Sequence, residues 1–191
     1  SSSTLLYNIA QWAYISPFEL QDKTFEGSGY DIACAQSMGP IIYAKNNKGP
    51  TWKSVSFSPL FKENLYFVYL NQKQNSRKAI HHYKSLSISN KTDVIKKINE
   101  LTKNIHTAID LKEFEDFLFE HESIISSTLD LPRVKDTNFS DYWGAVKSLG
   151  AWGGDFVLVT SDKDQQTTKD YFSKKGFDTF LTYEEMITEN F

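Results

Sequence analysis

The sequence predicts an α+β fold in which antiparallel strands pack against helices. Two strand patterns, at about 40–46 and 51–57, flank a loop that contains Asn47 and Gly49, which is typical of a hairpin. A continuous apolar segment at 64–70 predicts a strand that is buried on both faces. Helical and strand patterns alternate after that segment, so both kinds of element are expected to share one core.

Several segments have the spacing of amphipathic helices, with apolar residues every three or four positions. The first starts at Ser2 or Ser3, which can cap it, and it stops at Pro17. Thr92 is the expected cap of another helix, and Gly176 is the expected residue just after the last one. The expected helices cover about 3–16, 31–38, 76–86, 92–109, 114–131 and 164–175, and a final strand covers 177–183.

The pattern changes at Pro59, so we expect residues 1–58 to belong to a different domain from residues 59–191. The chain starts within a helix cap and has no initiator methionine. We therefore expect it to be the C-terminal part of a longer polypeptide.

Composition narrows the possible function classes. Among the 191 residues, 40% are hydrophobic and 15% aromatic, which is enough for a sizeable core. The net charge is -3 and no cluster of lysine or arginine interleaves with aromatic residues, so we expect no nucleic-acid partner. No apolar run approaches the ~20 residues of a membrane span. The lone Cys34 excludes a disulfide framework and fits a cytoplasmic protein.

A glycine turn, Gly27-Ser28-Gly29, stands directly before Asp31 and a helical pattern of small residues. One interpretation is a capping box, in which Ser28 and Asp31 each bind a free backbone N–H of the helix start. The other is catalytic, because glycines let a ligand approach the backbone and a carboxylate there can accept a proton from a substrate hydroxyl. The residues alone leave both interpretations open.

Two further stretches also allow both a structural and a functional interpretation. Between two strand patterns, Lys147 precedes Gly150, Gly153 and Gly154, which indicates either a hairpin turn or a phosphate-binding loop. At the N-terminus, Ser1 to Thr4 can cap a helix or bind phosphate and Mg²⁺ through hydroxyl and backbone N–H groups.

Taken in this order, the three stretches resemble the GHMP kinase superfamily, which includes galactokinase, homoserine kinase, mevalonate kinase and phosphomevalonate kinase. Ser1 to Thr4 are similar to the end of its Gly-Leu-Gly-Ser-Ser-Ala phosphate loop. Residues 27–43 match its Ser-Gly-x-Asp segment and are most similar to the Gly-Ser-Gly-Phe-Asp form of phosphomevalonate kinases. The chain is identified as a member of the subgroup named for the string Gly-Tyr-Asp-Ile-Ala, which here covers residues 29–33.

The third stretch matches the Lys-x-x-Gly-Ala-Gly-Gly-Gly segment of the superfamily, although Trp152 and Asp155 stand where the family has glycine. The resemblance implies the C-terminal portion of a two-domain fold. Residues 1–58 would end the N-terminal, ATP-binding domain, and residues 59–191 would form the C-terminal α+β domain. The first half of the phosphate loop is absent, so the isolated chain is expected to be inactive.

The function implied by the resemblance is an ATP-dependent kinase that phosphorylates a hydroxyl or phosphate of a small, mevalonate- or phosphomevalonate-like metabolite. Asp31 would orient or deprotonate the hydroxyl, and Ser2 would bind Mg²⁺. The serines Ser1, Ser2 and Ser3 would bind the ATP phosphates. The substrate side would be formed by Gly27, Ser28, Gly29, Lys147, Gly150, Gly153 and Gly154.

Other polar residues are weaker candidates for a role in a functional site. Arg133 is a second candidate cation for an anionic substrate, because it is near the third stretch in sequence. His121 lies on the apolar side of its helix and is expected to pack, as are Trp143 and Trp152. Two other function classes stay open, namely an inactive binding or regulatory protein with this fold and an unrelated α+β binding or dimerisation module.

Overall fold

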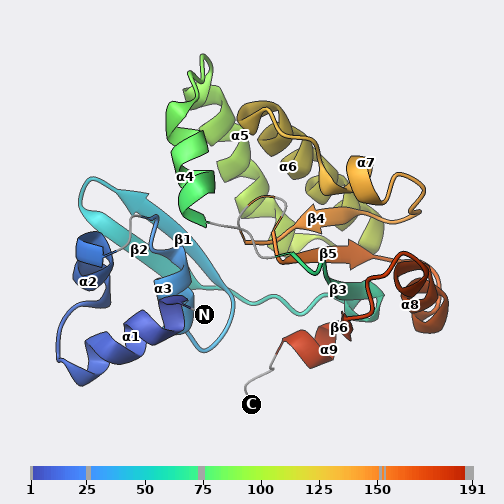
Figure 1. The fold of residues 1–191 in the computed structure, drawn as a ribbon, viewed down its shortest axis with the longest axis horizontal. Coiled ribbons are helices and arrows are strands. Elements are labelled where there is room, and N and C mark those ends of the chain that lie inside the picture. Colours follow the sequence, from blue (N-terminus) through green and yellow to red (C-terminus); the bar gives the residue numbers. More distant parts are fainter. Residues whose placement is uncertain (1, 25–26, 73–75, 151, 153, 188–191) are drawn as a thin grey trace. The chain divides into compact units, whose positions relative to one another are not determined.

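The computed structural model describes residues 2–24, 27–72, 76–150, 152 and 154–187, except the side chains of residues 2, 76 and 77. The chain forms two compact units, of which the first ends at Phe57 and the second begins at Ser58 (Figure 1). Both units combine helices with antiparallel strands, which confirms the α+β class.

The first unit has helices followed by a hairpin. Leu6 and Ala10 of its first helix are buried, and this helix packs against the third. Ile9, which lies between these two residues in sequence and has the apolar spacing, is 44% exposed, so the buried face of the helix is narrow. The elements are α1 (Ser2–Trp12), α2 (Pro17–Thr24), α3 (Tyr30–Ala35), β1 (Ile41–Asn46) and β2 (Gly49–Ser54).

The predicted hairpin is confirmed, but its second strand begins at Gly49, which was expected in the loop, and ends at Ser54. Strands β1 and β2 pair antiparallel, with Ile41 opposite Ser54 and Asn46 opposite Gly49. Helix α2 contacts the hairpin through aromatic rings, because the centroids of Phe18 and Trp52 are 5.6 Å apart.

The second unit contains a four-stranded antiparallel sheet in the order β4-β5-β3-β6. The predicted strand at 64–70 is its strand β3, whose residues are almost all buried. The strands are β3 (Leu65–Tyr69), β4 (Val146–Ser148), β5 (Phe156–Thr160) and β6 (Phe180–Thr182). The helices are η1 (Lys62–Asn64), α4 (Ser76–Ser85), α5 (Lys91–Asn104), η2 (Ile105–Thr107), α6 (Leu111–Leu129), α7 (Val134–Asn138), α8 (Gln165–Lys174) and α9 (Tyr183–Met186).

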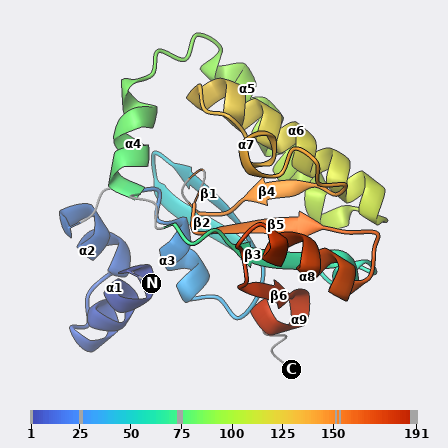
Figure 2. The same ribbon diagram turned by 45° about the vertical axis from the view of Figure 1, so that its right-hand side comes forward.

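The two faces of this sheet pack against different helices (Figure 2). One face presents Val68, Val157 and Val159 to a core that includes Phe172 of α8. The opposite face contains Lys147 of β4, since side chains alternate along a strand. Lys147 contacts α6, so this helix covers the second face.

Gly144 marks a place where the backbone must come very close to β5. A Cβ atom at this position would lie 1.9 Å from the carbonyl oxygen of Thr160, so no side chain fits. The same region is held by Tyr142, whose hydroxyl donates to that carbonyl oxygen at 2.7 Å.

Some helix ends differ from the sequence expectation. Helix α5 begins after Asn90 instead of Thr92, and it ends at Asn104, where the chain tightens into η2. Ile109 is therefore outside the helix and 78% exposed, although it continues the apolar spacing. The short helices α2, α7 and α9 were not predicted. Gly176 follows α8 as expected, and within the described ranges no helix is both long and apolar enough to cross a bilayer.

Candidate active site

The glycine turn of the first unit ends at Gly29, which caps α3 with a φ of 88°. This left-handed conformation suits glycine and starts the helix at Tyr30, one residue later than a cap at Ser28 would. Asp31 is therefore the second residue of the helix, whereas a capping box needs the acidic residue at the third. No side chain caps α3, so the capping-box interpretation of Ser28 and Asp31 is wrong.

Strand β1 holds this turn through two side chains. The Tyr43 hydroxyl donates to the carbonyl oxygen of Ser28 at 2.5 Å, and the Lys45 ammonium donates to that of Gly27 at 3.2 Å. Since Tyr43 and Lys45 are two residues apart on a strand, both side chains leave the same face of the hairpin. Neither residue was predicted from the sequence, although this alternation could have indicated that they share a face.

Helix α2 contacts the same turn. A Cβ atom at Gly29 would lie 3.1 Å from the ring of Phe18, and one at Gly27 would lie 2.9 Å from the amide nitrogen of Gln21. Gly29 itself is buried. The turn is therefore packed against α2 and hydrogen-bonded to β1. Gly29 is required by its positive φ and by the Phe18 ring, whereas the contact at Gly27 is with the end of a flexible side chain that can move away.

Asp31 lies directly after this turn, in the first turn of α3. The residue as a whole remains accessible to solvent, yet partial burial of its carboxyl group raises its pKa. A hydrogen bond from the neighbouring Tyr30 opposes this effect and lowers the pKa of Asp31. In turn, burial and the negative charge of Asp31 raise the pKa of Tyr30 to about 12. The result is a carboxylate that is more basic than an ordinary aspartate.

Cys34 is on the same short helix, three residues after Asp31. Its thiol is free and the residue is exposed. Partial burial, and then the charge of Asp31, raise the pKa of the thiol.

The serines at the N-terminus are described only in part. Ser1 and the side chain of Ser2 lie outside the described residues, while Ser3 is half-buried in the first turn of α1. Their roles toward ATP phosphates and Mg²⁺ stay predictions. No three His, Cys, Asp or Glu side chains of the described residues come together as a metal site.

The third glycine stretch joins β4 to β5 in the second unit, as the sequence indicated. Gly150 is exposed with a φ of 68°, and a Cβ atom there would meet nothing within 4 Å. Gly154 is buried, and Gly153 lies outside the described residues. The backbone at Gly150 is therefore open to solvent, whereas Gly29 of the first glycine turn is enclosed.

Lys147, at the start of this stretch, has its ammonium group within reach of several acceptors. It lies 3.2 Å from Oε1 of Glu122, 3.2 Å from the carbonyl oxygen of Ser148 and 3.3 Å from Nδ1 of His121. Burial lowers the pKa of Lys147, and the nearby Glu122 partly offsets this change. The ammonium group thus already donates to Glu122 and to the Ser148 carbonyl oxygen, so an anionic substrate would have to compete with Glu122.

Glu122 is the main residue of this cluster that was not predicted from the sequence. It is 2% exposed on α6, and Oε2 of its carboxylate has no hydrogen-bond partner among the described residues. Its position between His121 and Ser123, on a helix that otherwise buries apolar residues, was the available signal. His121 is hydrogen-bonded and half-buried, as predicted.

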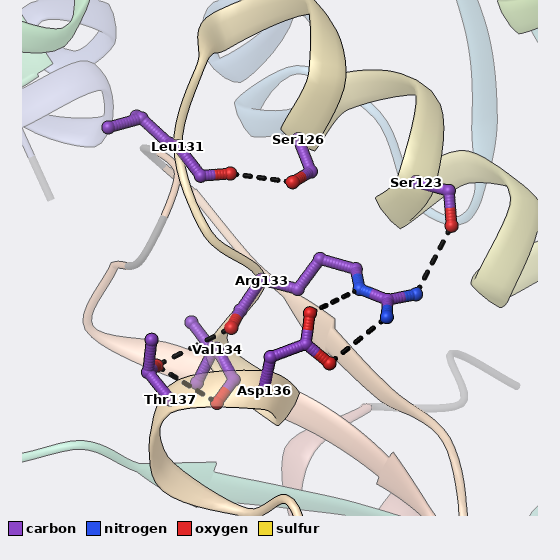
Figure 3. A network of polar contacts seen from close by, with 7 residues as sticks. All are labelled: Ser123, Ser126, Leu131, Arg133, Val134, Asp136 and Thr137. Atoms are coloured by element: carbon purple, nitrogen blue, oxygen red, sulfur yellow. Dashed lines mark hydrogen bonds and ion pairs between the residues drawn. The ribbon is translucent and has the colours of Figure 1, made fainter.

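Arg133 is engaged in a separate network between α6 and α7, which Figure 3 shows. Its guanidinium donates to both carboxylate oxygens of Asp136, at 2.8 and 3.0 Å, and to the Ser123 hydroxyl at 3.2 Å. The group also lies 4.8 Å from the ring centroid of Phe119. These contacts fix the turn after α6, and they leave Arg133 a weak candidate for substrate binding.

The candidate residues therefore fall into two sets. Gly27, Ser28, Gly29 and Asp31 lie together in the first unit, whereas Lys147, Gly150 and Gly154 belong to the second. Trp143 packs against the core of the second unit, as predicted, and its indole N–H donates to the Ser161 hydroxyl.

Two solved structures share this arrangement of elements. A mevalonate kinase from L. major, solved in complex with R-mevalonate, matches 83% of the chain with a TM-score of 0.59 and 15% sequence identity. The chain has a mevalonate-kinase-like fold. The Lin0012 protein from Listeria innocua matches 92% of the chain with a TM-score of 0.69 and 16% identity.

This mevalonate-kinase-like fold spans only part of the proteins it matches, namely 51% of the mevalonate kinase and 62% of the Lin0012 protein. No protein-family model and no curated protein sequence matches the chain. Structural similarity alone thus confirms the expected α+β fold, and this fold is similar to that of a mevalonate kinase.

Proposed function

We propose that the chain is part of an ATP-dependent small-molecule kinase of the GHMP type. In this proposal residues 1–58 end the ATP-binding domain and residues 59–191 form the C-terminal domain. The acceptor is a hydroxyl or phosphate of a mevalonate- or phosphomevalonate-like metabolite. The fold shared with a mevalonate kinase supports the class of protein, and the Gly-Ser-Gly-Tyr-Asp segment supports the acceptor class.

The observation that carries the proposal is the setting of Asp31. Its carboxyl group follows a glycine turn that is held by α2 and β1, and burial raises its pKa. A base works best when its pKa approaches the working pH, so a raised pKa favours proton transfer from a hydroxyl. A fixed position lowers the entropic cost of that transfer.

The proposed step uses Asp31 as the proton acceptor. As the acceptor oxygen of the metabolite forms its bond to the γ-phosphorus, the hydroxyl proton passes to the Asp31 carboxylate and the bond to ADP breaks. Mg²⁺-ATP, when bound, supplies the phosphoryl group and the charge neutralisation that phosphoryl transfer requires. Ser1, Ser2 and Ser3 are proposed to hold it, with Ser2 on the metal.

The test is Asp31→Asn in the complete protein. We expect phosphorylation of the hydroxyl of R-mevalonate to fall by about 10²–10⁴, the usual effect of losing a general base. Binding of an ATP analogue and the melting temperature should change little, because no side chain caps α3 in the native protein. Asp178→Asn, at an exposed position of the second unit, is the matched control.

An Asn variant that keeps its turnover would exclude Asp31 as the base. If the native protein binds these acceptors but transfers no phosphate, the inactive binding protein becomes the better description.

A further inference from the structure

The side chains that reach the glycine turn from β1 have no assigned role. Tyr43 and Lys45 donate to the carbonyl oxygens of Ser28 and Gly27, which are successive residues. These two peptide groups precede Gly29, whose φ of 88° sets the direction in which α3 leaves the turn. Any rotation of either peptide therefore moves the start of α3, and Asp31 with it.

The strand that supplies these donors is itself fixed. Tyr43 pairs with Trp52 and Lys45 pairs with Pro50 across the hairpin. The ring of Trp52 also contacts Phe18 of α2, the residue that packs under Gly29. The donors and the packing surface thus belong to one connected set of residues within the first unit.

We propose that Tyr43 and Lys45 are positioning residues for Asp31, acting by fixing the two carbonyl groups of the glycine turn. This inference rests on the proposed function, in which the Asp31 carboxylate meets a substrate hydroxyl. Small errors in such a contact are costly, since a displacement of about 1 Å can lower a rate by ~10²-fold. Carbonyls near the surface could instead bind water, so these bonds contribute orientation more than stability.

Tyr43→Phe and Lys45→Met remove one donor each and keep the bulk of the side chain. In the complete protein we expect kcat with R-mevalonate or its phosphate to fall by roughly tenfold for each variant, with the KM for ATP unchanged. The double variant should lose less than the product of the two single effects, because both donors act on one turn. Lys45→Arg should retain most of the activity, since it can still donate to Gly27.

Lys48→Met is the matched control. Lys48 is an exposed lysine in the loop of the same hairpin, and its own contact to Asn46 uses the backbone N–H. A general effect of removing a positive charge from the hairpin would appear in this variant as well.

Amide hydrogen exchange of residues 28–34 gives a readout that needs no activity. We expect exchange there to speed up roughly tenfold in Tyr43→Phe and Lys45→Met but not in Lys48→Met. Unchanged exchange together with unchanged kcat would overturn the inference, as would an equal effect of Lys48→Met.

Failure of the proposed function can be distinguished from failure of the positioning role of Tyr43 and Lys45. Full activity of Asp31→Asn would contradict the proposed function, and it would also contradict the positioning of Asp31 for catalysis. Loss of activity in Asp31→Asn together with native behaviour of Tyr43→Phe and Lys45→Met overturns the positioning role alone.

Discussion

The two glycine stretches look alike in sequence, but they are stabilised in different ways. At Gly29 the glycine itself is enclosed, with α2 packed against it and β1 bonded to its turn. At Gly150 the space around the glycine is open, and the fixed point is Lys147, whose ammonium is bound to Glu122. The first stretch thus fixes the position of Asp31. The second stretch is instead anchored by Lys147, three residues before Gly150.

The largest stability effect should come from the anchor of the second stretch. Glu122→Ala would leave the partly buried Lys147, whose side chain is 20% exposed, without its carboxylate. Breaking a fully buried pair on one side costs about 3–5 kcal/mol, so a loss of about 3 kcal/mol is expected here. We expect the free energy of unfolding of the second unit to fall by that amount in urea titrations. Glu120→Ala, at an exposed position of the same helix, is the control and should change it by less than about 0.5 kcal/mol. Equal losses of unfolding free energy in the two variants would contradict the role of Lys147 as the anchor of this stretch.

Alanine at the glycines tests the comparison directly. Both Gly29 and Gly150 have positive φ, so each Ala variant costs about 1–3 kcal/mol in backbone strain. At Gly29 the new Cβ also meets the Phe18 ring at 3.1 Å, which should add roughly 1 kcal/mol or more. Calorimetric melting of the two variants should therefore show the greater loss for Gly29→Ala. The reverse order would mean that the second stretch, and not the first, is the enclosed one.

The pH dependence of activity is the smallest expected effect. Because burial raises the pKa of Asp31, kcat/KM should fall on acidification at a pH above the ordinary aspartate value of ~3.9. Tyr30 lowers the pKa of Asp31 through its hydrogen bond, so Tyr30→Phe should move this acidic limb to higher pH. The measurement is the pH profile of kcat/KM for both proteins. A limb that moves to lower pH would show that the tyrosine acts mainly by burying the carboxyl group.

Much of the fold could be predicted because its signals are local. Strand β3 is a continuous apolar run, and apolar and polar residues alternate on both sides of Gly49, which indicates the hairpin. The helix α5 was predicted too long because Ile105 and Ile109 continue its spacing, while hydrogen bonding ends the helix at Asn104. Helices as short as α9, with four residues, offer too little periodicity to be recognised.

The candidate site was harder to predict, because its decisive contacts join residues far apart in sequence. Asp31 could be found from the glycines beside it, but Tyr43 and Lys45 reach the turn only after the hairpin has formed. Glu122 meets Lys147 only once α6 lies on the sheet. The capping box failed for a conformational reason, since the positive φ of Gly29 shifts the helix start by one residue.

The position of Cys34 has a practical consequence for chemical labelling. It is the only cysteine of the chain, it is exposed, and it lies on α3 three residues after Asp31. Since the thiolate is the reactive form, its raised pKa should make alkylation slow at neutral pH. Neutralising Asp31 removes one cause of that raised pKa, so the alkylation rate of a single native thiol reports the charge state of the neighbouring carboxyl group. The chain thus contains a reporter for its own candidate base, with no mutation needed to introduce it.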